Sequence, residues 1–175
     1  LNQYRAIFFD LSGVLYVGDH RVEGAVEAVT KARKQNKLLR FVTNTATKNR
    51  KQILEKLHHM DIPLEDNELF TAPMAARARV RDQGMRPYCL IHPNLKEDFA
   101  DLEQNQPNAV VLGDAREELK YENLNRAFQI VQEGGELIAI GYNRYFRNGE
   151  KLQLDAGPFV HALEWAADRK AVITG

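Results

Sequence analysis

The chain has 175 residues, with 24 Lys and Arg balanced by 24 Asp and Glu, 44% hydrophobic residues and one cysteine. This length fits one domain, or a core with an inserted module, and can bury a core without a disulfide or metal. A formal net charge of zero argues against a nucleic-acid partner, which would call for a basic face. No apolar run approaches the ~20 residues of a membrane span, and no signal-peptide pattern is visible, so no membrane partner is expected. Because the lone Cys89 has no partner for an internal disulfide, we expect a cytoplasmic protein.

The first half of the chain alternates short apolar runs with helical patterns. The runs at residues 5–11 and 38–43 predict buried strands, and apolar residues at helical spacing follow each of them. A further helix is predicted from Thr71 to about Gln83. Strand and helix in alternation with short links predict an α/β fold, with a parallel sheet covered by helices.

A second α/β stretch is predicted between residues 84 and 169. Its expected strands are residues 88–92, 109–112, 137–141 and 151–154, and its expected helices surround residues 121–131 and 159–167. The last apolar run, residues 171–174, resembles the first two strands, so we expect the chain to return there to its first sheet. This predicts a core over 1–83, an inserted domain over 84–169 and a return strand over 170–175. Because the chain starts without Met and stops just after a strand, we expect a fragment with a core truncated at its C-terminus.

Polar residues close two of the predicted parallel strands. Asp10, Ser12 and Gly13 follow the first strand, and Thr43 and Asn44 end the second. Ligands of open α/β sheets bind beyond the carboxyl ends of the strands. A carboxylate there can coordinate Mg²⁺ or attack phosphorus, Gly13 lets a phosphate approach the backbone, and the Thr43 hydroxyl can donate to a phosphoryl oxygen. The same residue types are also common in plain turns, so this simpler interpretation stays open.

Three segments carry a resemblance to a known family. The stretches FFDLSGVLY, VTNTATKN and LDAGPFVHALEWA with the later KAVITG resemble the haloacid dehalogenase-like (HAD) phosphatases with a large α/β cap. Within them, the chain looks most like the branch of phospholysine phosphohistidine inorganic pyrophosphate phosphatase and its HAD-domain relatives. The resemblance implies a Rossmann-like parallel sheet core with an inserted α/β cap. It further implies Mg²⁺ as cofactor and Asp10 as the nucleophile and a magnesium ligand. The Ser12 carbonyl would be a second ligand, and Thr43 and Asn44 would hold the phosphoryl group.

Two departures from the family pattern bear on the reaction. Most of the superfamily has an aspartate as general acid two residues after the nucleophile, whereas this chain has Ser12. Losing acid catalysis typically costs ~10²–10⁴-fold, which favours leaving groups that depart with little help, such as those of phosphoramidates and pyrophosphate. The family also has a lysine directly after the segment ending in Gly175, and then an acidic pair. Neither lies within this chain, so we expect an incomplete magnesium site and an inefficient fragment.

Other interpretations remain open at this point. A non-catalytic phosphate-binding or interaction protein on the same fold is the main alternative to a phosphatase of small phosphorylated substrates. A phospho-accepting receiver domain would need an acidic cluster near the first strand, and residues 2–4 supply none. If Asp114 with Glu117 and Glu118 were the acidic motif, Lys96 would be the phosphate lysine and the cap would be small. An exposed cap sheet would also allow a homodimer.

Several further side chains have both a structural and a functional interpretation. Cys89 is expected to be a buried structural residue, and Trp165 is expected to pack against its own helix face. Arg144, Tyr145 and Arg147 would either meet an anionic substrate or belong to a solvated hairpin, and we expect the hairpin.

Overall fold

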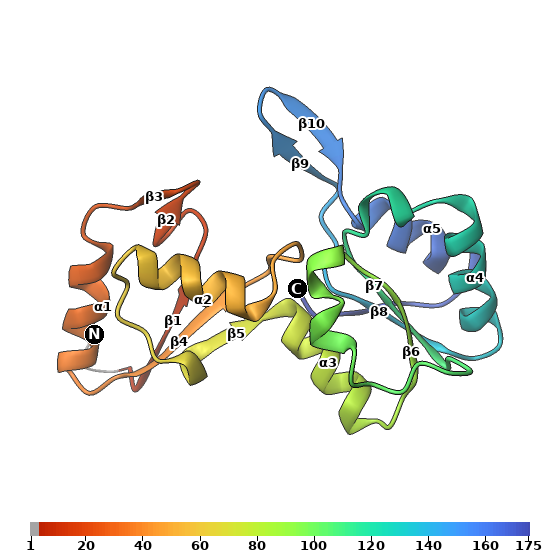
Figure 1. Ribbon diagram of the computed structural model, residues 1–175, viewed down its shortest axis with the longest axis horizontal. Coiled ribbons are helices and arrows are strands. Elements are labelled where there is room, and N and C mark those ends of the chain that lie inside the picture. Colours follow the sequence, from red (N-terminus) through yellow and green to blue (C-terminus); the bar gives the residue numbers. More distant parts are fainter. Residues whose placement is uncertain (1–3) are drawn as a thin grey trace. The chain divides into compact units, whose positions relative to one another are not determined.

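The structure, a computed structural model, describes residues 4–175, which divide between two units (Figure 1). Residues 4–43 and 50–71 form the first unit, and residues 44–49 and 72–175 form the second. Helix α3 (Ala72–Asp82) was expected in the first domain but groups with the second unit. The reason is packing, since Ala76 and Val80 of α3 lie in one core cluster with Val111 and Ile138. In the structure, the second unit therefore takes residues 44–49 and all residues from 72 onward.

The first unit is a parallel α/β layer. Its sheet has the order β1-β4-β5, and both pairings are parallel. The elements are β1 (Ala6–Asp10), β2 (Tyr16–Val17), β3 (His20–Arg21), α1 (Ala25–Lys34), β4 (Leu38–Thr43), α2 (Arg50–His59), the 3-10 helix η1 (Asp66–Glu68) and β5 (Leu69–Thr71). The expected strands at 5–11 and 38–43 are thus confirmed, whereas the very short β2, β3 and β5 were not predicted.

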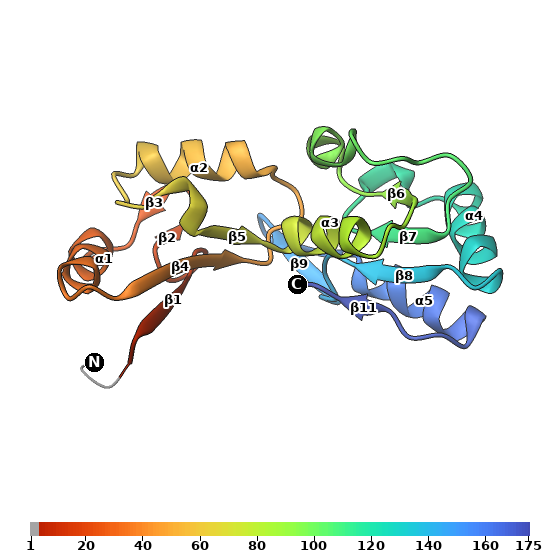
Figure 2. The same cartoon turned by 90° about the horizontal axis from the view of Figure 1, so that it is seen from below.

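Helices α1 and α2 pack on one face of this sheet (Figure 2). Phe41 of β4 is fully buried against Val29 of α1 and Leu57 of α2, because alternate residues of a strand point to opposite faces. On the other face, Phe8 and Phe70 are exposed within the described part of the chain. The core of this unit therefore lies on one side of β4, whose last residue is the predicted site residue Thr43.

The second unit has a sheet with the order β11-β8-β7-β6, in which all pairings are parallel. Its strands are β6 (Pro87–Leu90), β7 (Ala109–Leu112), β8 (Glu136–Ala139), β9 (Tyr145–Asn148), β10 (Lys151–Leu154) and β11 (Val172–Ile173). Its helices are α3, α4 (Tyr121–Gln132), α5 (Gly157–Ala167) and the 3-10 helices η2 (Pro93–Leu95), η3 (Glu97–Phe99) and η4 (Arg116–Glu118). Val110 faces the core built by α4 and α5, and Val111 faces the core that includes α3. Both faces of this sheet are therefore covered, as is usual for parallel sheets.

Strand β11 differs from its expected place. It was expected to return to the first sheet, but Val172 pairs with Ile138 and Ile173 with Ala139 of β8. The amide of Thr174 continues the ladder by donating to the carbonyl oxygen of Ala139 at 2.9 Å. β8, α5 and β11 form one strand–helix–strand unit, and such units place consecutive parallel strands side by side. A short apolar run predicts a strand but carries no information on which sheet accepts it.

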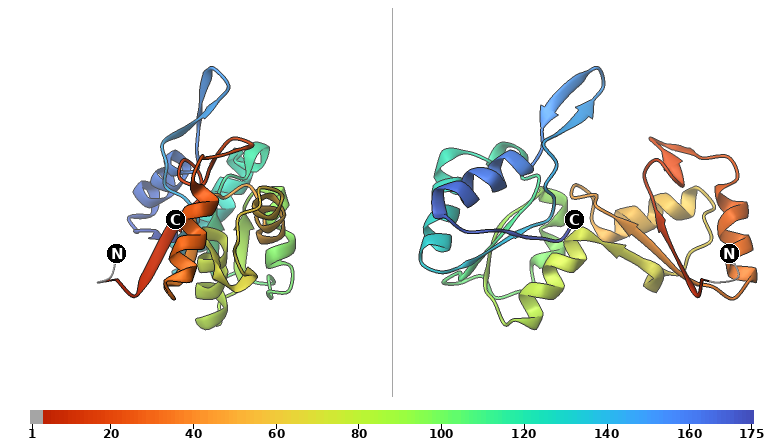
Figure 3. Two further views of the ribbon diagram at one scale, coloured as in Figure 1. Left: turned by 90° about the vertical axis from the view of Figure 1, so that its left-hand side faces the viewer. Right: turned by 180° about the vertical axis from the view of Figure 1, so that it is seen from behind.

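Strands β9 and β10 form a separate antiparallel hairpin that stands out from the second unit (Figure 3). Tyr145, Arg147, Leu152 and Leu154 are all exposed on it, as expected for a solvated hairpin. Nowhere in residues 4–175 is there a helix with the length and apolar character that a membrane span requires.

Candidate functional site

Asp10 and Thr43 end neighbouring parallel strands of the first unit. Asp10 is the last residue of β1 and pairs in register with Val42, so Thr43 lies one residue further along β4. The Asp10 side chain is exposed, and its Oδ1 accepts a hydrogen bond from the Leu11 amide at 2.8 Å. Thr43 is buried. The edge where the two strands end thus combines an accessible carboxylate with a hydroxyl-bearing residue.

The loop after Asp10 is closed by its own backbone. The amide of Gly13 donates to the Tyr16 carbonyl oxygen at 2.8 Å, and the amide of Leu15 donates to the Leu11 carbonyl oxygen at 2.9 Å. Ser12 also forms an isolated β-bridge with Tyr16. Gly13 has φ +84°, a conformation that residues with a Cβ rarely adopt, and no atom lies within 4 Å of where its Cβ would be. The space in front of Gly13 is therefore open to a ligand, while its N–H already has a partner within the loop.

Tyr16 and Lys56 also belong to this region, although sequence reasoning did not single them out. Tyr16 is buried, and its pKa is raised first by burial and then by the negative charge of Asp10. Lys56 of α2 has its Nζ 4.5 Å from the centre of the Tyr16 ring. Tyr16 could have been found from the sequence, because it closes the stretch FFDLSGVLY that contains Asp10. Nothing near Lys56 in the sequence indicates its contact with Tyr16.

The predicted magnesium ligands, Asp10 and Ser12, offer oxygen atoms of the type that Mg²⁺ binds, but they are few. Within residues 4–175, no group of three or more His, Cys, Asp or Glu side chains could hold a metal ion. The Asp10 carboxylate and the Ser12 carbonyl are oxygen ligands of the type that Mg²⁺ prefers, and Mg²⁺ commonly keeps several waters and binds through one or two carboxylates plus a substrate phosphate. These two residues fit a magnesium site that a substrate and further ligands complete.

The other predicted site residues lie in the second unit. Asn44 groups with that unit, although it directly follows Thr43 in the chain. Asp114, the alternative acidic residue, lies two residues after β7 of the second sheet, a different sheet from that of Asp10. It is buried and forms an ion pair with Arg116 at 3.1 Å, and the Arg116 guanidinium lies 5.0 Å from the centre of the Phe146 ring. Asp114 therefore pairs with a cation of the second unit and follows a strand of a different sheet from that of Asp10.

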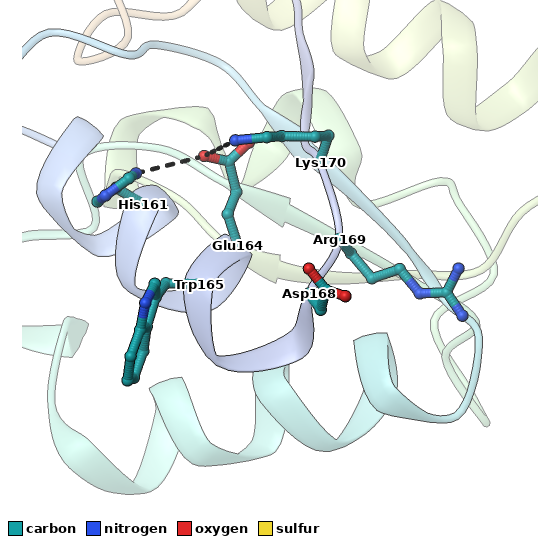
Figure 4. A pocket seen from close by; sticks show the side chains of 6 residues that line it. All are labelled: His161, Glu164, Trp165, Asp168, Arg169 and Lys170. Carbon is teal, nitrogen blue, oxygen red and sulfur yellow. Dashed lines mark ion pairs between the residues drawn. The ribbon is translucent and has the colours of Figure 1, made fainter.

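A cavity of about 360 Å³ lies at the end of α5, lined by charged residues and Trp165 (Figure 4). The Glu164 carboxylate is buried and accepts hydrogen bonds from the Tyr142 hydroxyl at 2.6 Å and the Ala171 amide at 2.9 Å. Burial alone would raise the pKa of Glu164, but these hydrogen bonds and the charge of Lys170 lower it overall. Trp165 is 83% exposed, which corrects the expectation that it packs against its own helix face.

Comparison with known proteins identifies the family of this chain. A family model described as "Haloacid dehalogenase-like hydrolase" matches residues 7–104. Haloacid dehalogenase-like hydrolase domain-containing protein 2 of Rattus norvegicus is 40% identical over 98% of this chain and 66% of its own length. The human phospholysine phosphohistidine inorganic pyrophosphate phosphatase is 36% identical over 98% of this chain and 66% of its own length. This chain thus spans about two thirds of the length of these curated relatives.

Solved structures show the same fold. A 4-nitrophenylphosphatase from Thermotoga maritima has a TM-score of 0.84 and 26% sequence identity, covering 99% of this chain and 69% of that chain. The structure of a "putative nagD protein" has a TM-score of 0.84 and 26% sequence identity, covering all of this chain and 72% of that chain. The α/β fold with parallel sheets agrees with both. The chain belongs to the haloacid dehalogenase-like hydrolases.

Proposed function

We propose that this chain is part of a magnesium-dependent phosphohydrolase in which Asp10 is the nucleophile. The observation that carries the proposal is the position of Asp10, an exposed carboxylate at the end of β1, beside the strand that ends in Thr43. Ligands of open parallel sheets bind beyond this edge. The human relative and the Thermotoga maritima protein are both named as phosphatases, which supports the same activity.

The reaction assigned to these residues has two steps. A carboxylate oxygen of Asp10 attacks phosphorus in line, so that the O–P bond forms while the bond to the leaving group breaks. Water then attacks the phosphorus of the aspartyl-phosphate, which releases phosphate and restores the carboxylate. The Thr43 hydroxyl and the Asn44 amide would donate to the phosphoryl oxygens in both steps. Mg²⁺, held by the Asp10 carboxylate and the Ser12 carbonyl, would supply positive charge to the transferring phosphoryl group.

Ser12 sets the class of substrate in this proposal. An alcohol does not readily protonate a leaving group near neutral pH, so an alkyl phosphate ester would be a poor substrate. A P–N bond or a pyrophosphate bond needs less help from an acid, and the human relative is named for phospholysine, phosphohistidine and pyrophosphate. We therefore assign small substrates with P–N or pyrophosphate bonds to this site.

The test is phosphate release by the complete protein, with and without Asp10→Asn. We expect release from phospholysine and pyrophosphate to exceed release from a sugar phosphate, and to vanish in Asp10→Asn. Asp82→Asn, at the exposed end of α3, is the matched control and should keep full activity. Release that survives Asp10→Asn, or a sugar phosphate hydrolysed faster than phospholysine, would contradict the proposal.

Ser12 favours the alternative, a phosphate-binding protein without turnover. In that case, calorimetry would detect phosphate binding, while phospholysine, pyrophosphate and the sugar phosphate would all remain unhydrolysed. The cytoplasmic location, the homodimer and the lack of a nucleic-acid partner stay predictions.

A further inference from the structure

The hairpin of β2 and β3 directly follows the Asp10 loop and is too short to hold itself in place. It consists of two pairs, Tyr16 with Arg21 and Val17 with His20. An isolated two-stranded hairpin is at best marginally stable in water, even with longer strands. Its position must therefore come from contacts with other elements of the first unit.

Lys56 of α2 provides one set of these contacts. Its Nζ donates to the Gly18 carbonyl oxygen at 2.6 Å and pairs with Asp19 Oδ1 at 2.9 Å, both in the turn of the hairpin. The same ammonium lies 4.5 Å from the centre of the Tyr16 ring. The Lys56 side chain is only 17% exposed, and charge-assisted hydrogen bonds and cation–π contacts strengthen when water is excluded.

Arg21, which belongs to the hairpin itself, provides a second set of contacts. Its Nη1 donates to the Met60 carbonyl oxygen at 2.7 Å, just after α2, and lies 3.6 Å from Asp61 Oδ2. The hairpin is thus attached to α2 at its turn and to the residues after α2 at its last strand. We call these contacts, made by Lys56 and Arg21, the hairpin clamp.

The clamp reaches the candidate site through Tyr16. The Tyr16 carbonyl oxygen accepts the Gly13 amide at 2.8 Å, and the Tyr16 amide donates to the Leu11 carbonyl oxygen at 3.3 Å. Tyr16 also bridges Ser12. A shift of the hairpin would therefore shift the loop that carries the predicted magnesium and phosphate contacts.

We propose that Lys56 is a positioning residue for phosphoryl transfer, which holds the Asp10 loop in its working geometry through the β2–β3 hairpin. The inference rests on the proposed function, since it assigns a role in the same reaction. Lys56 touches neither the substrate nor the reacting atoms. Loss of the Lys56 contacts should lower the rate of the chemical step, because small misplacements of a reacting group slow that step strongly.

The test compares Lys56→Met with Lys51→Met in the complete protein. Lys51 lies on the same helix, but it is 83% exposed and its ion pair with Glu55 measures 4.0 Å. With 4-nitrophenyl phosphate, we expect Lys56→Met to lower kcat about tenfold with KM changed less than about twofold, and Lys51→Met to change neither. Lys56→Arg, which keeps the charge and can lie over a ring, should recover most of the rate.

Hydrogen exchange separates positioning from general loss of structure. In Lys56→Met, amides of residues 13–21 should exchange faster while those of β7 in the second unit keep their rates. An unchanged kcat in a variant with faster exchange, or unchanged exchange with lowered kcat, would overturn the role assigned to Lys56. Hydrolysis abolished by Asp10→Asn but unaffected by Lys56→Met would overturn only the clamp. If the unmodified protein hydrolyses nothing, both the clamp's catalytic role and the proposed function fail.

Discussion

The ion pair of Arg33 and Glu68 offers a quantitative test of how the first unit is held together. The buried Glu68 carboxylate accepts hydrogen bonds from Arg33 Nη1 at 3.0 Å, from Arg33 Nη2 at 2.6 Å and from the Glu65 amide at 2.8 Å. Arg33 Nη2 also donates to the Pro63 carbonyl oxygen at 2.8 Å. The pair thereby ties α1 to the segment that leads into β5, the neighbour of β4. Glu68→Gln removes the charge and one acceptor while keeping the size of the side chain.

The expected loss of stability lies between those of an exposed and a buried ion pair. Exposed pairs contribute about 0–1 kcal/mol, whereas breaking a buried pair costs about 3–5 kcal/mol. The Glu68 side chain is 11% exposed and that of Arg33 is 37% exposed, so water can satisfy part of the guanidinium in the variant but little of the amide that replaces the carboxylate. We therefore expect Glu68→Gln to lower the free energy of unfolding of the first unit by about 2 kcal/mol.

Hydrogen exchange is the suitable assay because the two units need not unfold together. A loss of about 2 kcal/mol predicts roughly 30-fold faster exchange of the most protected amides in β4, with β7 of the second unit as an internal reference. Glu55→Gln is the control, because Glu55 is 55% exposed and its pair with Lys51 measures 4.0 Å. If Glu68→Gln accelerates exchange in β4 no more than Glu55→Gln does, the reasoning from burial is refuted.

The same pair gives a direction for the pH dependence. Burial alone would raise the pKa of Glu68, but the hydrogen bonds from Arg33 and from the Glu65 amide, with the charges of Arg33 and Arg40, lower it overall. A carboxyl group with a lowered pKa in the folded state stabilises the fold above its unfolded pKa, and this contribution is lost as the pH falls through the folded value. The difference in stability between the unmodified protein and Glu68→Gln should therefore shrink below about pH 4.

Two further predictions concern a strained backbone position and the thiol of Cys89, which is partly buried rather than fully buried as expected. Gly13→Ala should destabilise the first unit by about 1–2 kcal/mol in urea denaturation, because φ +84° disfavours a Cβ although no atom lies within 4 Å of it. If Gly13→Ala instead lowered the stability of the second unit, this local explanation would be contradicted. Burial raises the pKa of the Cys89 thiol to about 12, so at pH 8 a disulfide reagent should modify it at least ~100-fold more slowly than in the urea-unfolded chain. Comparable rates in the folded and unfolded chain would show that Cys89 is accessible.

Local patterns predicted the elements that carry the candidate site. The apolar run before Asp10 and the run before Thr43 are β1 and β4, and the expected helix after Thr71 is α3. These predictions succeed because a buried strand or an amphipathic helix shows its period within a few consecutive residues. The three-residue strand β5 and the hairpin of β2 and β3 are too short to show a period, and they were missed.

Long-range pairing was beyond the same patterns. The run at residues 171–174 was correctly predicted as a strand, but its partner β8 depends on the crossover through α5. Trp165 lies on a helix that was correctly predicted, yet its exposure depends on which side of α5 the neighbouring elements cover. The end of α3 was predicted to within about a residue, whereas its grouping with the second unit was not predicted.

The candidate site combines both kinds of information. Asp10 and Thr43 could be brought together from sequence because parallel strands align their carboxyl ends, so two strand-end residues on neighbouring strands must meet at one edge. Lys56 could not, because its contacts with Gly18 and Asp19 join residues far apart in the chain and depend on the reach of one side chain. Residues that react sit where the backbone topology places them, whereas residues that hold the reacting loop depend on tertiary packing. Variants of Lys56 therefore test what the structure adds, and variants of Asp10 test what the sequence already implied.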